Sequence, residues 1–485
     1  MLVGLGKLTQ NYFKVCLSVS IFSLGLAGLP NMTKKIFALK KLGAALLFVS
    51  PLLAHTGKVN AQALADELDR VLKQHQLIQM VDADVATAQE QVKVERSGYY
   101  PKLTLRAGAG KQHLKRQEGE SGHYDPTETS VGLNQLITDF GYTNARVDAA
   151  RAVVLKEEAE RELQRQNLTL AAIEAQLQLI QASQALNFAK ASEARIKEQT
   201  SLENARMEAG RGYATDVLQA KAQLAGAEAR RVGAERMLSL ALHRYETVFG
   251  TAPVNIKTLQ AIHIPVALMP TSQQQIIEGI AMQNPDVLAA IQRTNVTLAE
   301  RDVARKNELM PRLSLDVRRA RNHDYDGSRG RRDDTRAMIN LEWQFDLGMR
   351  AIHVSRSADQ AIVSSKQKAD YVRVQAREEA LNAWSEWQTS RLRSEHLINQ
   401  VNIAGNFLDL ARKEREMGRR SLLDILNGEV SLLNAQSDAT VARIDEVIAA
   451  YRLLRAVGRL SPNILREPGI VVPAESLLTA ALPNG

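Results

Sequence analysis

The chain has 485 residues, of which 45% are hydrophobic, 24% charged and 5% aromatic, with 28 glycines and 13 prolines. This composition excludes a disordered or collagen-like polymer and leaves too few turn residues for a β protein built from short repeats. The formal net charge is +8, but residues 1–63 hold seven lysines and no arginine or acid. The remainder is nearly neutral, with 55 basic and 54 acidic residues, so a basic surface for nucleic acid is not indicated.

Residues 1–63 have the order of an N-terminal extension followed by an export signal. From Met32, four lysines precede an apolar run over 42–53, and small residues around Ala61 and Ala63 offer a cleavage site. A membrane anchor over 15–29 is the alternative. The single cysteine, Cys16, precedes the expected cut, so we expect a mature chain without disulfides and without a cysteine for lipid anchoring. No later segment offers the roughly 18 apolar residues of a membrane-spanning helix.

The remainder of the chain is an internal duplication. Three landmarks recur in one order, at offsets of 207 to 210 residues: YPKLTL (100–105) as MPRLSL (310–315), TDFG (138–141) as FDLG (345–348), and Gly-Arg followed by Asp-Val-Leu (210–218) as Gly-Arg followed by Asp-Ile-Leu (418–426). The recurrence predicts two structural repeats. The expected segments are a first repeat over 64–250, a linker over 251–283, a second repeat over 284–461 and a tail over 462–485.

Long helices dominate both repeats. Residues 142–209 contain neither glycine nor proline, and proline is absent from 312 to 461. A helix of 68 residues would be about 100 Å long. Apolar residues recur along these segments at heptad-like spacing, which predicts coiled-coil packing between neighbouring helices. The helices alone are equally consistent with a structural protein, a periplasmic coiled-coil scaffold.

Between the helices lie four expected strands, at about 101–112, 128–139, 311–320 and 335–346. Each alternates with a period of two, with Leu103 and Leu105 on one face and Thr104 and Arg106 on the other, which is typical of a tilted transmembrane strand. Aromatic residues gather at the strand ends nearest the helices and predict an interfacial girdle: Tyr99, Tyr100, Phe140, Tyr142, Trp343 and Phe345. A soluble half-buried sheet is the alternative. Four strands cannot close a barrel, so the strands must come from two or three copies of the chain.

No catalytic pattern is present in the sequence. There is no HExxH pair, P-loop or G-x-S-x-G, and the nine histidines are scattered. We expect no enzyme activity, no cofactor and no metal site, although His113 and His123 share one loop. The arginines of segment 318–336 alternate with aspartates, which indicates a solvated extracellular loop. Contact with lipopolysaccharide phosphates is the alternative.

Taken together, these features resemble the TolC family of outer membrane factors. They are the duplicated helix–hairpin–helix plan, the two strand starts, Asn284-Pro285-Asp286 and the two Gly…Asp turns, and they cover about residues 62–461. The resemblance implies a homotrimer, with a twelve-stranded barrel in the outer membrane and a twelve-helix tunnel extending into the periplasm. It also implies a periplasmic adaptor (membrane fusion) protein, an inner-membrane ABC transporter or other pump, and contact with outer membrane lipids, but no nucleic acid.

Within this family, the missing lipid-anchor cysteine favours the type I secretion branch over the lipoprotein branch of drug efflux. We therefore expect a mainly α protein with transmembrane β-strands that exports a large polypeptide, such as an adhesin. Multidrug efflux is the alternative within the family, and the coiled-coil scaffold is the alternative from another class. An adaptor usually carries a β-rich lipoyl-like domain, and no such segment is visible here.

The helix–helix turns at 210–216 and 418–424 are expected at the periplasmic tips, where the adaptor would dock. Gly210, Gly212 and Gly418 permit the positive φ that ends a helix. Exposed residues around the two turns are the expected contacts: Arg211, Tyr213, Arg419, Ser421 and Leu422.

The same tips are expected to form the gate of the tunnel. By resemblance to the family's closed state, Arg420 would pair with Asp216 across hairpins, and the three copies of Asp424 would form an acidic ring that attracts divalent cations. The alternative is local, because Ser421 to Asp424 fits a capping box. Asn427 stands where some relatives carry a second acid, so the cation block should be weaker.

Overall fold

The computed structural model describes residues 62–115, 121–253, 255–256, 259 and 262–466. The expected export signal over 1–63, apart from its last two residues, and residues 467–485 of the expected tail lie outside the described residues. The first repeat contains α1 (Gln62–Gln74), α2 (Gln76–Arg96), β1 (Lys102–Ala109), β4 (Thr127–Thr138), α3 (Tyr142–Glu208) and α4 (Ala214–Phe249). The second contains α5 (Gln273–Gln283), α6 (Pro285–Leu309), β5 (Arg312–His323), β6 (Arg331–Glu342), α7 (Arg350–Glu416) and α8 (Leu422–Ala456).

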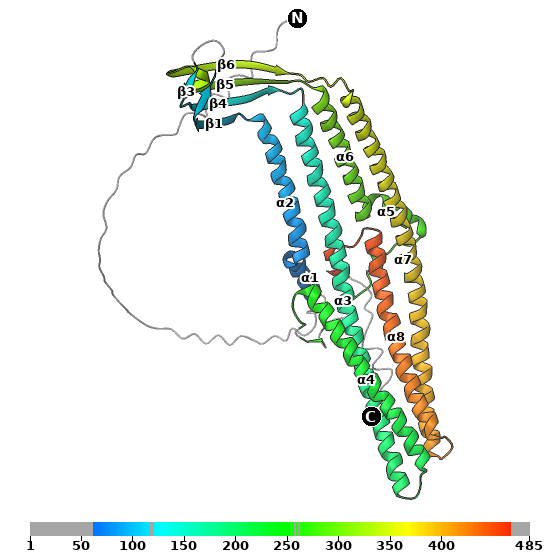
Figure 1. Cartoon of the computed structure of the whole chain (residues 1–485). Helices are drawn as coiled ribbons and strands as arrows, with labels where there is room; N and C mark the ends of the chain where they lie inside the picture. Colours follow the sequence, from blue (N-terminus) through cyan, green and yellow to red (C-terminus); the bar gives the residue numbers. More distant parts are fainter. Residues whose placement is uncertain (1–61, 116–120, 254, 257–258, 260–261, 467–485) are drawn as a thin grey trace, which may run out of the picture. The chain divides into compact units, whose positions relative to one another are not determined.

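The two repeats have the same order of elements, as the duplication predicts (Figure 1). Helix α5 occupies the range expected to be a linker, and it corresponds to α1 of the first repeat. The break between α5 and α6 has a local cause: Asn284 is the N-cap of α6, its side chain accepts the Val287 amide at 3.0 Å, and Pro285 follows as the first helical residue. The second repeat therefore begins with α5, earlier than the expected boundary at 284.

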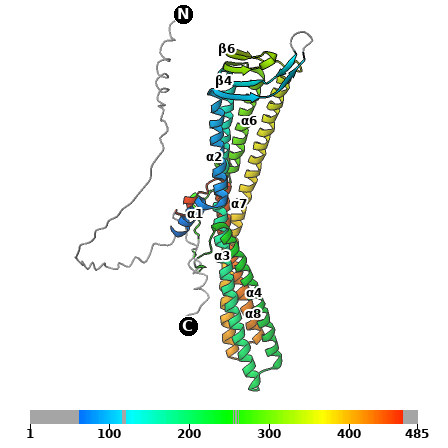
Figure 2. The same ribbon diagram turned by 60° about the vertical axis from the view of Figure 1, so that its left-hand side comes forward.

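Helices α3 and α7 are the longest elements, with 67 residues each. Near the sheet, α2, α3, α6 and α7 pack in this order, whereas α4 and α8 pack along the distal halves of α3 and α7 (Figures 1 and 2). The largest hydrophobic core lies at the middle of this arrangement, where the fully buried Tyr245 and Tyr451 join α4 and α8 to their neighbours. Two smaller clusters continue the core toward the hairpin ends.

The four main strands form one antiparallel sheet in the order β1-β4-β5-β6. Within the described residues, β1 and β6 each pair along one edge only. Between β1 and β4, two short strands, β2 (Gln112–Leu114) and β3 (Gly122–Tyr124), form a separate two-stranded sheet that the sequence analysis did not anticipate.

The strands of the second hairpin begin and end at different residues from those expected. Strand β5 continues to His323 and β6 begins at Arg331, so most of the arginine-rich segment is strand and only 324–330 connects the two. Opposite charges across the ladder account for the extension, because Arg321 lies directly opposite Asp333 and their side chains pair at 3.1 Å. Strand β6 also ends at Glu342, so the aromatics Trp343 and Phe345 follow the strand.

None of the described helices contains a stretch that is both long enough and apolar enough to cross a membrane.

Candidate functional site at the hairpin tips

The two hairpin tips have the same backbone turn. Gly210 and Gly418 adopt φ values of +72° and +74°. After each glycine, the amide of Arg211 or Arg419 donates to the carbonyl oxygen five residues back, at 2.8 and 2.9 Å respectively. These are Schellman turns, which satisfy the last carbonyls of α3 and α7. Glycine is required because a Cβ strains the backbone at positive φ.

Gly212 has a different reason to be glycine from the expected one. It is absent from the described residues with positive φ, but a Cβ at this position would lie 3.0 Å from the Met207 amide nitrogen. Close approach of the turn to the end of α3 therefore requires a residue without a side chain.

The two second helices begin differently. Ser421 is the N-cap of α8, and its hydroxyl accepts the Asp424 amide at 3.2 Å. Tyr213 occupies the N-cap of α4 without a side-chain hydrogen bond. Asp216 and Asp424 each lie at the third residue of their helix, where a carboxylate interacts favourably with the helix dipole. The capping interaction proposed for Ser421 is therefore present.

Most of the expected docking residues are exposed, but Leu422 is not. Tyr213 is 76% exposed, and Arg211, Arg419 and Ser421 are also exposed. The expectation for Leu422 was wrong, because this side chain is 3% exposed and packs in a cluster with Ile196, Ala220, Ala227 and Leu426. Its burial joins the first residue of α8 to α3 and α4. The neighbouring Leu423, at 38% exposure, faces solvent instead.

Arg420 contacts residues of its own hairpin. Its Nε donates to Glu414 Oε2 at 2.8 Å, its Nη1 lies 4.0 Å from Asp424 Oδ2, and its guanidinium lies 5.5 Å from the centre of the Phe407 ring. Among the contacts of the described residues, none joins Arg420 to Asp216. The pairing of these two residues across hairpins therefore stays a prediction about the assembled protein.

Two buried glutamates, which the sequence analysis missed, join the two hairpins near the tips. Glu203 of α3 is 2% exposed and accepts Arg415 of α7 at 2.6 Å and Arg206 at 2.8 Å. Glu429 of α8 is equally buried, pairs with Arg412 of α7 and lies 3.4 Å from Arg195 of α3. The signal for Glu203 was available, since it follows the buried Ile196 and Thr200 on one helical face.

At the other end of the helices, five of the six aromatics expected to form the girdle are exposed in the single chain, and the sixth, Tyr142, is half-buried. Trp343 and Phe345 pack with ring centres 4.6 Å apart, and the Trp343 indole donates to the Leu309 carbonyl at 3.2 Å. The exposed fractions run from 43% to 71%, for Tyr99, Tyr100, Phe140, Trp343 and Phe345. Exposed aromatics with one polar atom satisfied are typical of an interfacial position.

Asp139 fixes the corner where β4 turns into α3. Its side chain accepts the Gly141 amide at 3.1 Å and the Thr143 amide at 2.7 Å. Asp346 accepts the Gly348 amide at 2.7 Å in the second repeat. The duplicated Asp-x-Gly motif therefore stabilises the turn from strand to helix in both repeats, and in the first repeat it also caps α3 through the Thr143 amide.

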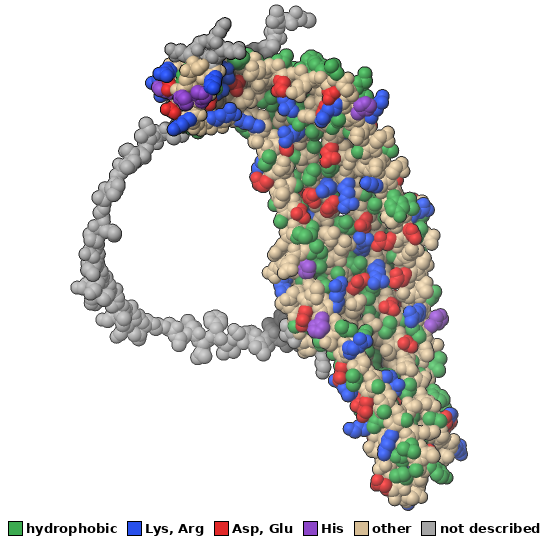
Figure 3. Space-filling model, viewed as in Figure 1, with side chains coloured by type: hydrophobic (Ala, Val, Ile, Leu, Met, Phe, Trp, Pro, Cys, Tyr) green, Lys and Arg blue, Asp and Glu red, His purple; other side chains and the backbone are tan. Residues whose placement is uncertain are grey.

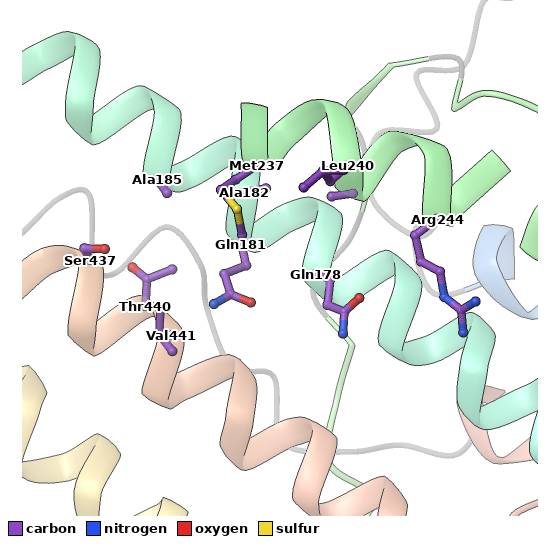
Figure 4. Close-up of a pocket in the computed structure, with 11 residues that line it drawn as sticks. Gln178, Gln181, Ala182, Ala185, Met237, Leu240, Arg244, Ser437, Thr440 and Val441 are labelled. Carbon is purple, nitrogen blue, oxygen red and sulfur yellow. The ribbon is translucent and has the colours of Figure 1, made fainter. Parts of the chain in front are cut away.

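A cleft of about 470 Å³ lies between α3, α4 and α8 (Figure 4). Gln178 and Gln181, Met237 and Leu240, and Thr440 line it.

No group of three or more metal-ligating side chains was found among the described residues. His113 and His123 lie opposite each other in the β2–β3 sheet, with ring centres 4.3 Å apart.

Comparison with known proteins identifies this arrangement. The model of the outer membrane efflux protein family matches residues 68–251 and 276–459, which are the two repeats. The chain belongs to this family. Outer membrane efflux protein BepC of Brucella suis is 25% identical over 88% of the chain and 92% of its own length. Outer membrane protein TolC of Vibrio cholerae is 24% identical over 86% of the chain and 95% of its own length.

Other relatives show the breadth of the family. Alkaline protease secretion protein AprF of Pseudomonas aeruginosa is 24% identical over 75% of both chains. The solved CmeC outer membrane channel of Campylobacter jejuni superposes with a TM-score of 0.72 at 17% identity, over 82% of this chain and 85% of that one, which supports the fold. The resemblance to TolC-family channels is confirmed. The protein is an outer membrane channel that extends into the periplasm.

Proposed function

We propose that three copies of the chain assemble into one channel that exports polypeptides, in type I secretion, from an inner-membrane pump and a periplasmic adaptor. The observation that carries the proposal is the sheet: β1 and β6 each have one edge without a strand partner in the described residues. Open edges are not tolerated in lipid, because their amides and carbonyls need hydrogen-bond partners. Pairing β6 of one copy with β1 of the next satisfies both edges and closes a barrel of twelve strands.

The two faces of the sheet support this closure. Leu103, Leu105, Ile339 and Leu341 lie on one face and are 63% to 70% exposed in the single chain. In the proposed barrel this apolar face contacts lipid, and the opposite polar face lines the lumen. The α3–α4 and α7–α8 hairpins then continue the conduit as a tunnel through the periplasm, as the resemblance implies.

Polypeptide secretion is favoured over drug efflux by two observations. One relative carries alkaline protease secretion in its name, and the chain has no cysteine after Cys16 to accept a lipid anchor. The description of the family supports efflux, so the experiment must distinguish polypeptide cargo from drugs.

Conductance tests the channel itself. The purified protein should run as a heat-dissociable trimer and give ion-conducting steps in planar bilayers. Because residues 62–466 contain no cysteine, cysteine pairs placed along β1 and β6 should form disulfides only between different chains. Monomeric protein without conductance would contradict the channel and favour the scaffold.

Cargo is tested in cells that lack their own outer membrane channel. The chain is supplied together with an adaptor and a transporter from the same genome, and secreted polypeptide in the medium and drug susceptibility are measured separately. Polypeptide in the medium without a change in susceptibility supports secretion, whereas restored drug resistance alone would favour efflux.

Adaptor docking at the tips is tested by cross-linking. Cysteines at Tyr213 and Leu423 should form adducts with the adaptor in cells, while a cysteine at the buried Leu422 serves as the matched control and should remain unreactive. Reaction of the exposed cysteines with small maleimides but never with the adaptor would contradict docking at this surface.

The gate is tested by conductance of the closed channel. Arg420→Ser and Asp216→Ala should both raise conductance if the pair across hairpins holds the aperture shut, and Asp424→Ala should weaken block by divalent cations. Glu414→Gln is the matched control, because it removes the partner of Arg420 within the chain. If Glu414→Gln opens the channel and Asp216→Ala does not, the pair of Arg420 with Glu414, rather than the pair with Asp216, holds the aperture shut.

A further inference from the structure

The polar face of the sheet carries a group of arginines beyond what the channel function requires. In an antiparallel ladder, directly opposed residues and residues two apart share a face. By the observed register, Arg318 lies opposite Arg336, and Arg106 and Arg332 fall on the same face two and four rows away. We call these four residues the arginine band: Arg106, Arg318, Arg332 and Arg336.

Acidic residues on this face do not balance the band. Glu128 and Asp334 are the acids at the same levels of the sheet, which leaves an excess of two positive charges in each chain. Only one ion pair within the described residues involves the band, between Arg318 Nη2 and Glu128 Oε1 at 2.8 Å. Nearer the helices, Lys102 and Asp316 lie in one row and Arg312 and Glu342 in another, so charge is balanced there.

The surroundings leave the guanidinium groups accessible. Gly132 lies directly beside Arg318 in the ladder, and Gly108 lies two residues after Arg106. Neither glycine carries a side chain that could cover the neighbouring arginine, and a Cβ at Gly108 would meet no atom within 4 Å, so the space beside Arg106 is open. Arg106, Arg332 and Arg336 are exposed, and Lys and Arg side chains gather at this end of the sheet (Figure 3).

Like charges directly opposite each other destabilise a sheet. Glu128 offsets the charge of Arg318, so Arg336 is the member of this opposed pair that lacks an ion pair among the described residues, and guanidinium groups bind carboxylates and other oxyanions well. If three chains close the barrel, the excess charge is repeated three times around one water-filled lumen, whose low-dielectric wall concentrates the field on permeating ions.

We propose that the arginine band forms an anion-selecting ring in the outer half of the channel, which favours anions and the carboxylates of acidic cargo. This inference rests on the proposed function, because it requires the polar face to line a closed lumen. It assigns the channel two ends of opposite charge, arginine at the sheet and Asp216 and Asp424 at the tips.

The test is the reversal potential of single channels in a KCl gradient, from which the chloride-to-potassium permeability ratio follows. Arg106→Gln and Arg336→Gln should each lower this ratio at least about twofold. Asp334→Asn should raise it. Arg336→Lys keeps the charge and should restore the wild-type value.

Arg319→Gln is the matched control. Arg319 lies in the next row of β5 and on the opposite, apolar face, between Val131 and Thr335, so its loss should leave the ratio unchanged. Conducting channels in which Arg336→Gln has no effect, or in which Arg319→Gln has an equal effect, would overturn the inference while leaving the channel intact. Absence of conductance in the wild-type protein would instead overturn the proposed function, and the inference with it.

Discussion

The buried carboxylate of Glu203 should be the strongest single tie between the two hairpins. Its side chain is 2% exposed, and it accepts Arg415 at 2.6 Å from the other hairpin and Arg206 at 2.8 Å from its own helix. The Arg206 pair lies within one helix turn and on a half-exposed side chain, so it contributes only about 0.3–0.5 kcal/mol. The cross-hairpin pair therefore decides the outcome.

Glu203→Gln removes the charge but keeps the shape. Breaking a fully buried ion pair costs about 3–5 kcal/mol, because the remaining charge is left unpaired. Arg415 retains 18% exposure and also donates to the Arg420 carbonyl at 3.3 Å. We therefore expect the substitution to lower the free energy of unfolding by about 2–3 kcal/mol. The exposed Glu198→Gln, on the same helix, should change it by less than about 0.5 kcal/mol.

The assay is urea unfolding followed by the helical circular dichroism signal, performed as a double-mutant cycle with Arg415→Met. The two substitutions should be less than additive by at least about 1 kcal/mol. Full additivity, with Glu203→Gln as harmless as Glu198→Gln, would refute the view that this ion pair joins the hairpins.

Four further substitutions test the packing and the electrostatics of the helical region. Gly250 and Gly458 adopt φ values of +73° and +75°, but only at Gly458 would a Cβ meet backbone, 1.9 Å from the Gln283 carbonyl oxygen. Gly250→Ala should therefore cost about 1–2 kcal/mol, while Gly458→Ala should abolish the folded protein on gel filtration. Leu408 is 1% exposed, so Leu408→Ala should lower the free energy of unfolding by about 2–5 kcal/mol; a loss below about 1 kcal/mol in urea unfolding would contradict the packing. Burial raises the pKa of the Asp445 carboxyl in the folded protein. Its contribution to stability is therefore fully present below the unfolded-state pKa, where the carboxyl is protonated, and is lost as the pH rises through the folded-state pKa. Asp445→Asn should hence raise the Tm near neutral pH and leave the Tm at acid pH unchanged. A variant with the wild-type Tm at both pH values would refute the raised pKa of Asp445.

Elements set by local chemistry could be predicted closely from the sequence. The prediction of a helix over 142–209 compares with α3 at Tyr142–Glu208, because the segment lacks helix breakers and Gly210 supplies the left-handed residue that ends it. The strand positions were also recognisable from their alternation. Their ends were not, because the extension of β5 to His323 depends on ion pairs with a second strand.

Features that depend on contacts between hairpins could not be predicted in the same way. Leu422 follows an N-cap at an apparently open tip, and only the approach of α3 and α4 buries it. Three acids lie within six residues of Arg420 in the sequence, and spacing alone does not indicate which of them it contacts: Glu414, Glu416 and Asp424. The structure pairs it with Glu414 at 2.8 Å in the single chain, whereas the pair with Asp216 depends on how chains assemble.

The duplication and the ion pairs between hairpins follow different rules. Some positions that serve a hairpin by itself carry the same residue in both repeats: Gly210 and Gly418, and Asp216 and Asp424, are each 208 residues apart. Positions that contact the other hairpin differ: at the same offset, Glu203 corresponds to the buried Ala411 and Glu429 to the exposed Lys221. The ion pairs also join positions that the duplication does not relate, since Arg415 lies 212 residues after Glu203 rather than 208. Each repeat therefore supplies a different partner to the ion pair, which makes Glu203 and Glu429 more informative about how the two hairpins join than the turns that both repeats share.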